Sequence, residues 1–590
     1  MKKFLLTAAM LTMLITVADA VEYEFLTPQT VVLKAPGKAP VNHSTVGKDI
    51  VAEGFWAKEN GLLRDEKGNI TRKADITAYT YLIFGKPFQP GEKRDLKTVV
   101  LQYDPAVPSN IFKLNQVGNG VNQKQKYAYM GAWLGSAGAL PLKHLAGKEF
   151  EIRRSSDSKS VYKNILKLRR DDPKYLDKTP FTGEEVLELD YSNFNTPGKY
   201  YFYIDTIGRS TDFVIGPETL NEAFYIHARG LYHKRCGIAK KQPFTAWTSP
   251  ACHQTAVRGR FPGNAEHYRK NKGGKDCGFF DIKDNRIEVK HFDLIKENPP
   301  YQQEIITAPG GWHDAADYDR RPYHLRIVSD LAAVYLMKPE NFIDGQLNIP
   351  ESGNGIPDIL DEAAWGVKHL LAAQQANGGV GTWFETTGHP VPGEGLPDSE
   401  KRTYYISVPG RNSTLEYAAV ASTLALAMKK AGAESEAEKY LASAVKAWKF
   451  AMEPLNRSVF WLYLKQRMIS YREEPFLYAE NLLKAGANLY ILTGEREYIE
   501  PVLDDQERIK DTFNKDFWKW SPLSLMNLEL YPVKELECFR NEYRKVILRE
   551  AGRMVAEQEN AYPYRTLWHA HNAGWVHAMS WGNYHPLRRA

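Results

Sequence analysis

Hydrophobic and polar positions along the chain change their period near residue 218. Before it, apolar residues alternate with polar ones in short runs bounded by turn residues, the pattern of strands with one buried face. The runs with this pattern are TVVLQYD, KYAYMGAWL, FEIRR, VLELDYSNF and KYYFYIDTIG. Their spacing predicts a β-sandwich over residues 106–218. Residues 21–105 are predicted to be an additional β-rich segment, either a separate sheet or an extension of the sandwich.

Beyond residue 218 the apolar residues follow the period of an α-helix. Ile359, Ala363, Val367 and Leu370 share one face of a predicted helix, and Pro357 suits its first turn. Helices without intervening strands over 219–590 predict a helical barrel or solenoid. The long loops between them are where a site is expected. The predicted helices span 222–236, 323–337, 356–371, 414–430, 435–452, 476–493, 497–514, 538–558 and 571–590.

Charge and terminal patterning narrow the class of protein. The 590 residues carry 77 basic and 71 acidic side chains, a net charge of +6 without a basic run, which gives no support for nucleic-acid binding. Lys2 and Lys3, an apolar run and Ala18-Asp19-Ala20 predict a signal peptide over residues 1–20. We therefore expect a secreted or periplasmic protein. No later apolar run reaches 18 residues, so no membrane contact is expected of the mature form.

The segment GGWHDAADY, residues 310–318, carries the first candidate chemistry. Asp314 and Asp317 lie three residues apart, and two like charges at about 4 Å repel by about 4 kcal/mol at an effective dielectric near 20. Such a pair can hold one water, with one carboxylate taking its proton as it attacks an acetal carbon. Capping of the following helix is the alternative on the pair alone.

GGWHDAADY and the later segment NGIPDILDEAAWGVKHLLAAQ together resemble glycoside hydrolase family nine. LYHKRCG and SPACH are similar to the opening of its catalytic domain, and FKLNQVG, VLELDYSNF and GKYYFYI are similar to the immunoglobulin-like module that often precedes it. The motifs lie in the family's order over residues 110–590. Ala316 stands where the family's motif has Gly, which is a mild departure.

The resemblance implies an immunoglobulin-like sandwich followed by an (α/α)6 barrel. It implies inverting hydrolysis of β-1,4-linked glucans, with Asp317 as the general base and Asp314 helping to hold the water. The family's acid, a glutamate far downstream, would fall beyond Ala590, and fewer helices are predicted than a full barrel needs. We therefore expect a barrel incomplete at its C-terminus.

Two alternatives stay open at this point. One is an exo-acting β-glucosidase or a glucosaminidase that acts on oligosaccharides. The other is a non-catalytic sugar-binding protein that lacks its general acid. In each case the expected partner is a β-glucan or an oligosaccharide.

Four residues combine into a candidate metal site. Cys236, Cys252, His253 and His313 could supply two thiolates and two imidazoles, the ligand set of a closed zinc site. Members of the family with a similar RCG…CH pattern carry a structural zinc, which strengthens the hypothesis. A disulfide between Cys236 and Cys252, or ordinary buried thiols, are the alternatives. Cys277 and Cys538 are interpreted as packed thiols.

Further residues are candidates for binding substrate or calcium. Stacking on sugar rings is considered for aromatic residues, although burial in the core explains a tryptophan equally well. His569 is a candidate donor to substrate hydroxyls. An acidic cluster could bind calcium, as in some family members, but favourable charge at a helix start is the preferred interpretation. The aromatic candidates are Trp312, Tyr318, Trp383 and Trp568, and the acidic cluster is Asp358, Asp361 and Glu362.

Overall fold

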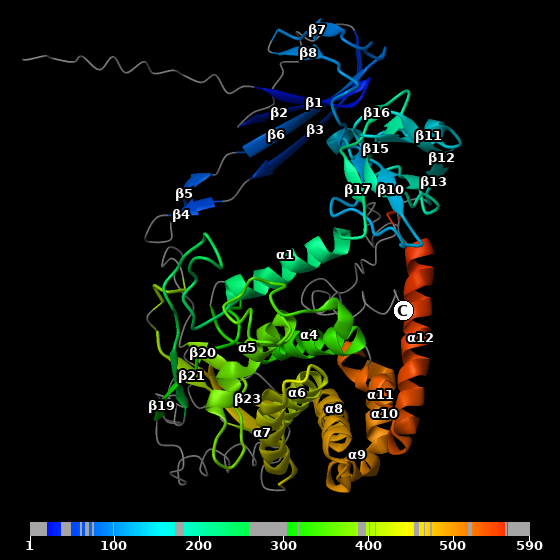
Figure 1. Ribbon diagram of the computed structural model, residues 1–590. Helices are drawn as coiled ribbons and strands as arrows, with labels where there is room; N and C mark the ends of the chain where they lie inside the picture. Colours follow the sequence, from blue (N-terminus) through cyan, green and yellow to red (C-terminus); the bar gives the residue numbers. More distant parts are fainter. Residues whose placement is uncertain are drawn as a thin grey trace, which may run out of the picture. The chain divides into compact units, whose positions relative to one another are not determined.

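The computed structural model of the chain, shown as a ribbon in Figure 1, describes the β-strands and helices in a series of separate residue ranges. The expected signal peptide over 1–20, the predicted helix over 571–590, Asp317, Cys277, Trp568 and His569 lie outside the described residues. Those described are 21–36, 49–59, 62–64, 70–73, 76–97, 99–170, 182–258, 304–314, 318–386, 397–400, 402–407, 409–453, 459–464, 467–472, 475–516, 522–560 and 563–564.

The described residues form two compact units. One contains residues up to 223 and the segment 554–570, and the other contains 224–553. Strands fill the first and helices predominate in the second (Figure 1), as the change of period near residue 218 predicted. The predicted order of a β-rich part followed by a helical part is therefore confirmed.

Residues 21–105 build a sheet of their own in the β-rich unit. Its strands alternate between two cores: Val31 and Leu33 pack with Phe84 and Phe88 in one core, whereas Val32 joins the core of the following sheets. The strand order is β1-β2-β6-β3, with small β4-β5 and β7-β8 hairpins nearby in sequence. The strands are β1 Glu22–Thr27, β2 Thr30–Pro36, β3 Ile50–Glu59, β4 Leu62–Arg64, β5 Ile70–Lys73, β6 Ile76–Phe84, β7 Lys93–Asp95 and β8 Val100–Gln102.

Two further antiparallel sheets follow, with orders β13-β14-β10-β9 and β12-β11-β15-β16, and β17 pairs with β15. Their inward residues, such as Met130, Phe150, Leu189 and Phe202, share one buried core. This is the predicted sandwich arrangement. The strands are β9 Phe112–Lys113, β10 Tyr127–Met130, β11 Glu149–Arg154, β12 Ser160–Ile165, β13 Lys167–Leu168, β14 Leu187–Asp190, β15 Gly198–Ile204, β16 Gly208–Arg209 and β17 Phe213–Ile215.

The helical unit is organised around α6, which is buried on nearly all sides. Apolar and small residues surround this helix, as expected for a segment enclosed by other helices, and α4, α5, α7 and α8 pack against it. The α-helices are α1 Thr219–Lys234, α4 Leu325–Met337, α5 Asp358–Ala373, α6 Arg411–Lys430, α7 Glu434–Met452, α8 Pro475–Thr493, α9 Glu500–Asp504, α10 Gln506–Asp516, α11 Asn527–Leu530 and α12 Glu537–Asn560.

The single helix predicted over 497–514 is wrong, because the chain is broken there into α9 and α10. The break falls at Asp505, whose residue type has a low intrinsic helix propensity. Its carboxylate lies at the positive start of α10 and forms an ion pair with Arg508. This local arrangement stabilises a new helix start rather than one continuous helix.

The prediction of a unit without strands between its helices is also wrong. A small sheet of order β19-β18-β21-β20 is formed by segments that lie far apart in sequence, and β22 pairs with β23. The strands of the small sheet are too short for alternation to show, and their pairing is long-range, whereas β22 and β23 form a local hairpin that was not predicted from the sequence. The strands are β18 Thr255–Arg258, β19 Glu304–Thr307, β20 Phe384–Thr386, β21 Tyr404–Ile406, β22 Val459–Leu464 and β23 Arg467–Arg472.

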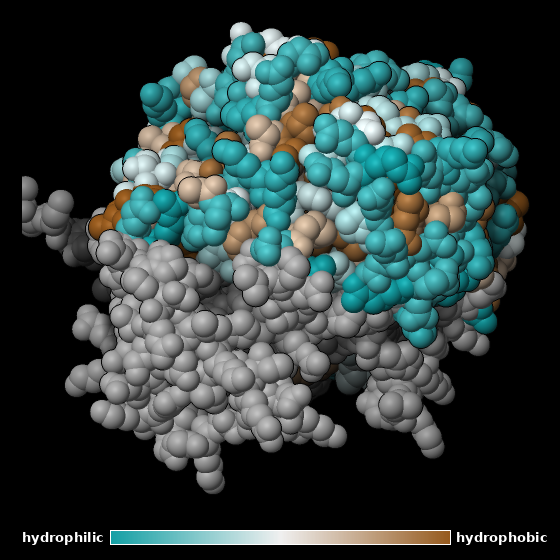
Figure 2. Space-filling model, turned by 90° about the horizontal axis from the view of Figure 1, so that it is seen from below, coloured by the Kyte–Doolittle hydropathy of each residue, from teal (hydrophilic) through white to brown (hydrophobic). Residues whose placement is uncertain are grey.

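The surface agrees with the composition of the chain. Among the residues that Figure 2 colours by hydropathy, hydrophilic ones predominate and the hydrophobic ones lie in small separate areas. Among the described residues, every helix is too short or too polar to cross a bilayer.

Candidate functional site

Two segments far apart in sequence pair to build the centre of the site. Residues 234–237, which begin at the last residue of α1, run against residues 310–313, and Arg235 is bridged to Trp312. The Cys236 amide donates to the Gly311 carbonyl at 2.9 Å, and the His313 amide donates to the Lys234 carbonyl at 2.9 Å. This backbone pairing brings a cysteine and a histidine together before any side-chain contact is considered.

The glycine pair at 310–311 is required by the close approach of α5. Gly310 and Gly311 have φ angles of 129° and 73°, values that L side chains rarely adopt. A Cβ at Gly310 would lie 2.6 Å from the His369 amide nitrogen, and one at Gly311 would lie 2.7 Å from the His369 ring. The two glycines therefore hold the segment that carries His313 and Asp314 directly against α5.

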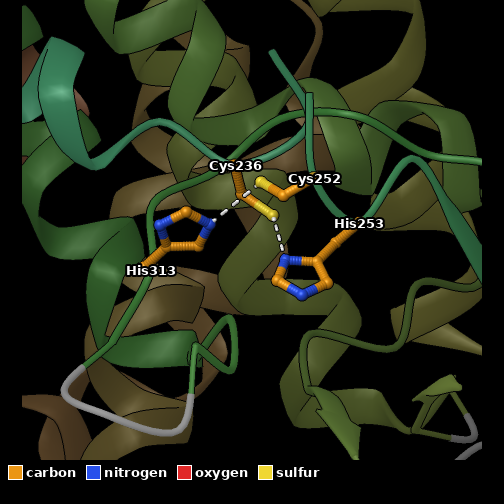
Figure 3. A group of neighbouring side chains, drawn as sticks. All are labelled: Cys236, Cys252, His253 and His313. Atoms are coloured by element: carbon orange, nitrogen blue, oxygen red, sulfur yellow. Dashed lines mark hydrogen bonds between the residues drawn. The ribbon is translucent and has the colours of Figure 1, made fainter. Parts of the chain in front are cut away.

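Cys236, Cys252, His253 and His313 converge in one cluster, as Figure 3 shows. Their ligand atoms all lie within 4.8 Å of one another. The Cys236 Sγ lies 3.5 Å from His253 Nδ1, and the Cys252 Sγ lies 3.3 Å from His313 Nε2. Three of the four residues are buried, and His253 is half-buried. The sequence-based hypothesis predicted this convergence of side chains.

The chemistry of the donor set fits a metal ion better than the alternatives. Cys236 and Cys252 are free thiols, so the disulfide alternative is wrong for this structure. Hydrogen bonds, chiefly from Cys236, lower the pKa of Cys252, whereas burial raises the pKa of Cys236. Burial also lowers the pKa of His313, which favours the neutral imidazole, and His253 presents its Nδ1 to the Cys236 sulfur. Two sulfurs and two imidazole nitrogens at this spacing can hold one tetrahedral ion.

Asp314 is held by donors from the residues that follow it. The Tyr323 hydroxyl donates to its Oδ2 at 2.9 Å, Arg321 Nε lies 3.6 Å from the same oxygen, and His324 Nε2 lies 3.6 Å from Oδ1. The hydrogen bonds from His324 and Tyr323 outweigh partial burial and lower the pKa of Asp314 to about 2. The carboxylate is consequently ionised and oriented at neutral pH.

The three donors around Asp314 were not identified from the sequence. The signal was present in RRPYH, directly after the aspartate pair, because Pro322 starts a 3-10 helix that holds Tyr323 and His324 in one turn. Arg321 also pairs with the buried Asp319 at 3.0 Å. Hydrogen-bond donors to a carboxylate can therefore be sought in the first turn of the helix that follows it in sequence.

Two of the aromatic candidates lie near this segment. The guanidinium of Arg321 lies 5.3 Å from the ring centre of half-buried Trp383, and Trp383 precedes β20. Tyr318 has a φ of 56°, and its ring centre lies 5.5 Å from that of His313. Trp383 and Tyr318 are therefore gathered around the loop that carries Asp314 and the metal cluster.

Trp312 does not have the exposure that the sugar-stacking prediction requires. It is 2% exposed, and its Nε1 donates to Glu362 at 2.8 Å. A Cβ on Gly366 of α5 would lie 2.3 Å from the Trp312 ring, so the ring fills the space beside that glycine. The prediction for Trp312 is wrong because the indole packs inward against α5.

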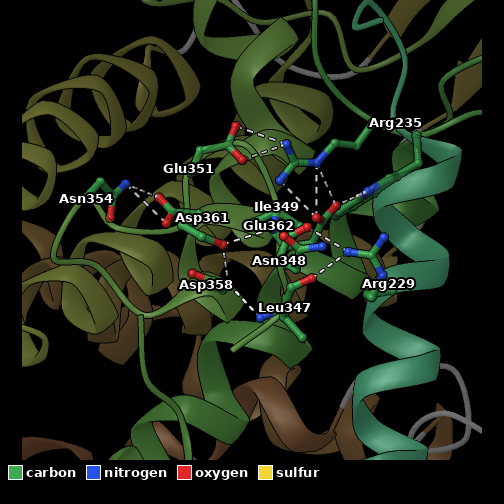
Figure 4. A network of polar contacts seen from close by, with 12 residues as sticks. Arg229, Arg235, Leu347, Asn348, Ile349, Glu351, Asn354, Asp358, Asp361 and Glu362 are labelled. Atoms are coloured by element: carbon green, nitrogen blue, oxygen red, sulfur yellow. Dashed lines mark hydrogen bonds and ion pairs between the residues drawn. The ribbon is translucent and has the colours of Figure 1, made fainter. Parts of the chain in front are cut away.

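The acidic cluster at the start of α5 is satisfied by protein donors, as Figure 4 shows. Asp358 accepts from the Gly345 and Leu347 amides and from the Ser352 hydroxyl. Asn354 donates to both oxygens of Asp361, at 3.1 and 3.2 Å. This arrangement favours hydrogen bonding and helix-start charge over calcium binding.

Glu362 completes the acidic cluster through the fully buried Arg235. The Arg235 guanidinium lies between Glu362 and Glu351, at 2.9 Å from each carboxylate (Figure 4). Burial raises the pKa of Glu362, and the charge of Arg235 opposes that shift. Of the groups searched among the described residues, the cysteine–histidine cluster is the one that combines three or more ligands at metal-binding spacing.

Family models match both units of the chain. The model of glycosyl hydrolase family 9 matches residues 221–587, and the model of the cellulase N-terminal ig-like domain matches residues 108–209. The first match covers more than half of the chain. The order of the two matches is the order predicted from the sequence motifs.

Curated relatives are similar over parts of their length. The chain is 30% identical over 218 residues to a cellulose 1,4-beta-cellobiosidase of Acetivibrio thermocellus, covering 34% of this chain and 22% of that protein. It is 23% identical to endoglucanase D of Acetivibrio thermocellus, covering 60% of this chain and 50% of that protein. A xyloglucan-specific endo-beta-1,4-glucanase of Bacteroides ovatus is 21% identical, and the match covers 77% of this chain and 70% of that protein. The chain thus spans about half the length, or less, of the first two.

Solved structures share the fold. A metagenome-derived glycoside hydrolase family 9 endoglucanase superposes with a TM-score of 0.57 at 22% identity, covering 77% of this chain and 74% of that one. A zinc-binding triple mutant of a family 9 endoglucanase superposes with a TM-score of 0.56 at 20% identity, and the match covers 76% of this chain and 74% of that one. The expected immunoglobulin-like domain and (α/α)6-barrel fold are confirmed. From its motifs, its two family matches and its fold, the chain belongs to glycosyl hydrolase family 9.

Proposed function

We propose that this protein hydrolyses β-1,4-linked glucans with inversion at the anomeric carbon. Asp317 acts as the general base, and Asp314 orients the attacking water beside it. The endoglucanase names of the relatives support a glucan as the substrate. Tyr318 and Trp383, with Trp568 and His569, are the residues proposed to contact sugar.

The environment of Asp314 is the observation that carries this proposal. A carboxylate with a pKa of about 2, held by a tyrosine, a histidine and an arginine, stays ionised across the pH range in which a glycosidase works. It can therefore accept a hydrogen bond from water without taking its proton. In this division of roles the proton of the attacking water passes to Asp317, three residues along the chain, while a separate carboxylic acid must protonate the leaving oxygen.

We further propose that zinc is the ion of the cysteine–histidine cluster. Cys236, Cys252, His253 and His313 would fill four positions and leave none for water, so the site would be structural rather than catalytic. When bound, the ion supplies a cross-link between residues 236–253 and residues 310–313, the segment that leads into Asp314. The residues of the chain hold His313 in place through this link and through the backbone pairing.

The decisive experiment compares three proteins on carboxymethylcellulose and xyloglucan. Asp317→Ala should lower kcat by at least about 1,000-fold. General base catalysis raises the rate by about 10²–10⁴-fold, and the attacking water would also lose its hydrogen-bond acceptor. Asp314→Asn should lower kcat by about 100-fold, with a smaller change in KM. Glu340→Gln, at a surface glutamate paired with Lys338, is the matched carboxylate control and should keep full activity.

The product anomer tests the stereochemistry independently. Proton NMR of early product should show the α-anomer released from a β-glucan, because an inverting enzyme uses one displacement. Release of the β-anomer would overturn inversion. Sugar binding with no hydrolysis by the wild-type chain would favour the sugar-binding protein without its acid.

The mode of attack on the chain is separated by two measurements. Rapid loss of viscosity of soluble cellulose would support endo action, the activity in the names of two relatives. Release of monomer from short oligosaccharides with little change of viscosity would favour the exo-acting β-glucosidase or glucosaminidase.

Export is proposed from the charged and apolar pattern of the first residues. Residues 1–20 would be removed, giving a secreted or periplasmic protein that begins at Val21. N-terminal sequencing of the exported protein checks this: a protein that retains Met1 contradicts it.

A further inference from the structure

A hollow of about 570 Å³ lies on the β-rich unit over strands β9 and β10. Its volume is within the range of small-molecule sites. It is lined by aromatic side chains and by exposed polar ones, among them Asn110, Lys113 and Gln116. The hydrolytic function proposed above assigns no role to it.

Two tyrosines form its aromatic surface. On β10, Ala128 and Met130 are fully buried in the sandwich core, so Tyr127 and Tyr129 lie on the opposite, outward face. Side chains two residues apart on a strand are spaced by about 6.8 Å, which presents two rings in a row. The edge of the Tyr129 ring meets Tyr564 at 5.6 Å between centres, which restrains the orientation of that ring.

The rim of the hollow is held in place by local hydrogen bonds. Strand β9 ends at Lys113, and the chain then turns away over residues 114–118. The Asn115 side chain accepts from the Val117 amide at 3.1 Å and donates to the Gly118 carbonyl at 2.6 Å. Gly118 has a φ of 92°, and a Cβ there would lie 2.6 Å from the Val214 carbonyl, so the turn requires glycine.

The polar groups of the lining suit a ligand rich in hydroxyl groups. Lys113 is the cation among the lining residues, and its Nζ already donates to the Asn110 carbonyl at 2.7 Å. The exposed amides of Asn110 and Gln116 can both donate and accept. A sugar ring has an apolar face and carries hydroxyl groups around its edge. The tyrosine rings are complementary to the apolar face, and the amides are complementary to the hydroxyl groups.

We propose that this hollow is a second glucan-binding site, in which Tyr127 and Tyr129 stack on neighbouring sugar rings and the amides of Asn110 and Gln116 bind hydroxyl groups. The choice of a β-glucan rests on the proposed function, whereas the preference for a sugar chain rests on the paired rings and the amides of the lining. Such a site would retain the polymer on the β-rich unit independently of turnover.

The test measures binding of cellohexaose and soluble xyloglucan by isothermal titration calorimetry. The full chain is used with Asp317→Ala, which prevents consumption of the ligand. Two binding events per chain are expected, and Tyr127→Ala with Tyr129→Ala should remove one of them or weaken it by about tenfold or more. Tyr127→Phe with Tyr129→Phe retains both rings and should bind within about threefold of the parent.

Tyr203→Ala, at a half-buried tyrosine on the other sheet of the sandwich, is the matched control. Its binding should equal that of the parent. One binding event in the parent, or unchanged binding after both tyrosines are removed, would overturn the inference. Tyrosine-dependent binding by a wild-type chain that hydrolyses nothing would contradict the proposed function and leave this inference standing.

Discussion

Two buried polar clusters begin at consecutive residues and are satisfied in different ways. Arg235 lies between the carboxylates of Glu351 and Glu362, so charge is balanced within the protein. Cys236, the next residue, faces the His253 ring at 3.5 Å, and Cys252 faces the His313 ring at 3.3 Å. Both clusters are rich in groups that can bind a metal, but the sulfurs and ring nitrogens of the second contact chiefly one another, with no arginine or carboxylate of the described residues between them.

This difference teaches how to distinguish a metal site from an acidic cluster. Carboxylates buried beside a helix start can be neutralised by arginine, amides and hydroxyl groups, and then need no ion. Sulfurs and imidazole nitrogens gathered without such an arginine form the ligand set that a metal ion can complete. Three experiments sharpen the comparison, from the largest expected effect to the smallest.

Removal of the metal should have the largest effect. We expect one zinc per chain in the wild-type protein and none in Cys252→Ala. We expect the free energy of unfolding of the helical unit to fall by more than about 5 kcal/mol, since binding energy of a structural zinc is folding energy. Mass spectrometry for metal content and calorimetry for unfolding measure the two quantities.

Cys538→Ala is the control for this change. Its thiol lies 3.2 Å from Gln506 Oε1 and outside the cluster, so zinc content should be unchanged. Less than one zinc per wild-type chain, with oxidised thiols, would contradict the metal site.

Breaking the charge network should have an intermediate effect. Glu362→Gln leaves Arg235 buried with one carboxylate partner, and loss of a buried ion-pair partner is worth about 3–5 kcal/mol. Urea unfolding should show this loss, whereas Glu340→Gln should change stability by less than about 0.5 kcal/mol. Added calcium should leave both unfolding midpoints in place. A clear rise of the urea midpoint with calcium would mean that the network does need an ion.

The smallest expected effect concerns the pH dependence of stability at Asp361. Burial, with repulsion from Glu351 and Asp358 against the pull of Arg235 and the Asn354 hydrogen bond, raises the pKa of Asp361 to about 7. The pKa of this carboxyl is near 3.8 in the unfolded chain and about 7 in the folded protein, so the folded protein binds the proton more tightly. The resulting stabilisation is fully present below pH 3.8 and is lost as the pH rises to about 7.

Asp361→Asn removes this titration. Relative to wild type, the variant should gain about 1–3 kcal/mol on going from pH 4 to pH 8, measured as unfolding free energy at each pH. Equal pH dependence of the two proteins would contradict the raised pKa. Asp344→Asn, at a half-buried carboxylate whose pKa is lowered by hydrogen bonds from the Gly353 and Gly355 amides, should not reproduce the gain.

The parts of the site that could be predicted are those in which residue type alone limits the chemistry. Cys236, Cys252, His253 and His313 were grouped from their ligand types, and the family motifs named the aspartates. The β-sandwich and the helical part followed from the change of period, and the resemblance of the motifs to the family implied the immunoglobulin-like and (α/α)6-barrel folds. Long-range backbone pairing, which actually assembles the cluster, leaves no local pattern in the sequence.

The failures have the same physical origin. Trp312 was assigned to the sugar because it flanks the aspartates, yet neighbouring residues of an extended segment point to opposite sides. Its indole consequently points toward Gly366 on α5, a contact between residues more than fifty positions apart. The donors Tyr323 and His324 required knowledge of where the 3-10 helix begins.

The contact between Gly310–Gly311 and His369 has an evolutionary consequence. Neither glycine offers a functional group, so a survey of chemistry would pass over both. Yet a single added methyl would push the backbone off α5 and displace an aspartate three residues away. In a library of random variants, these two positions should tolerate as little change as the reacting residues themselves, although neither carries a side chain.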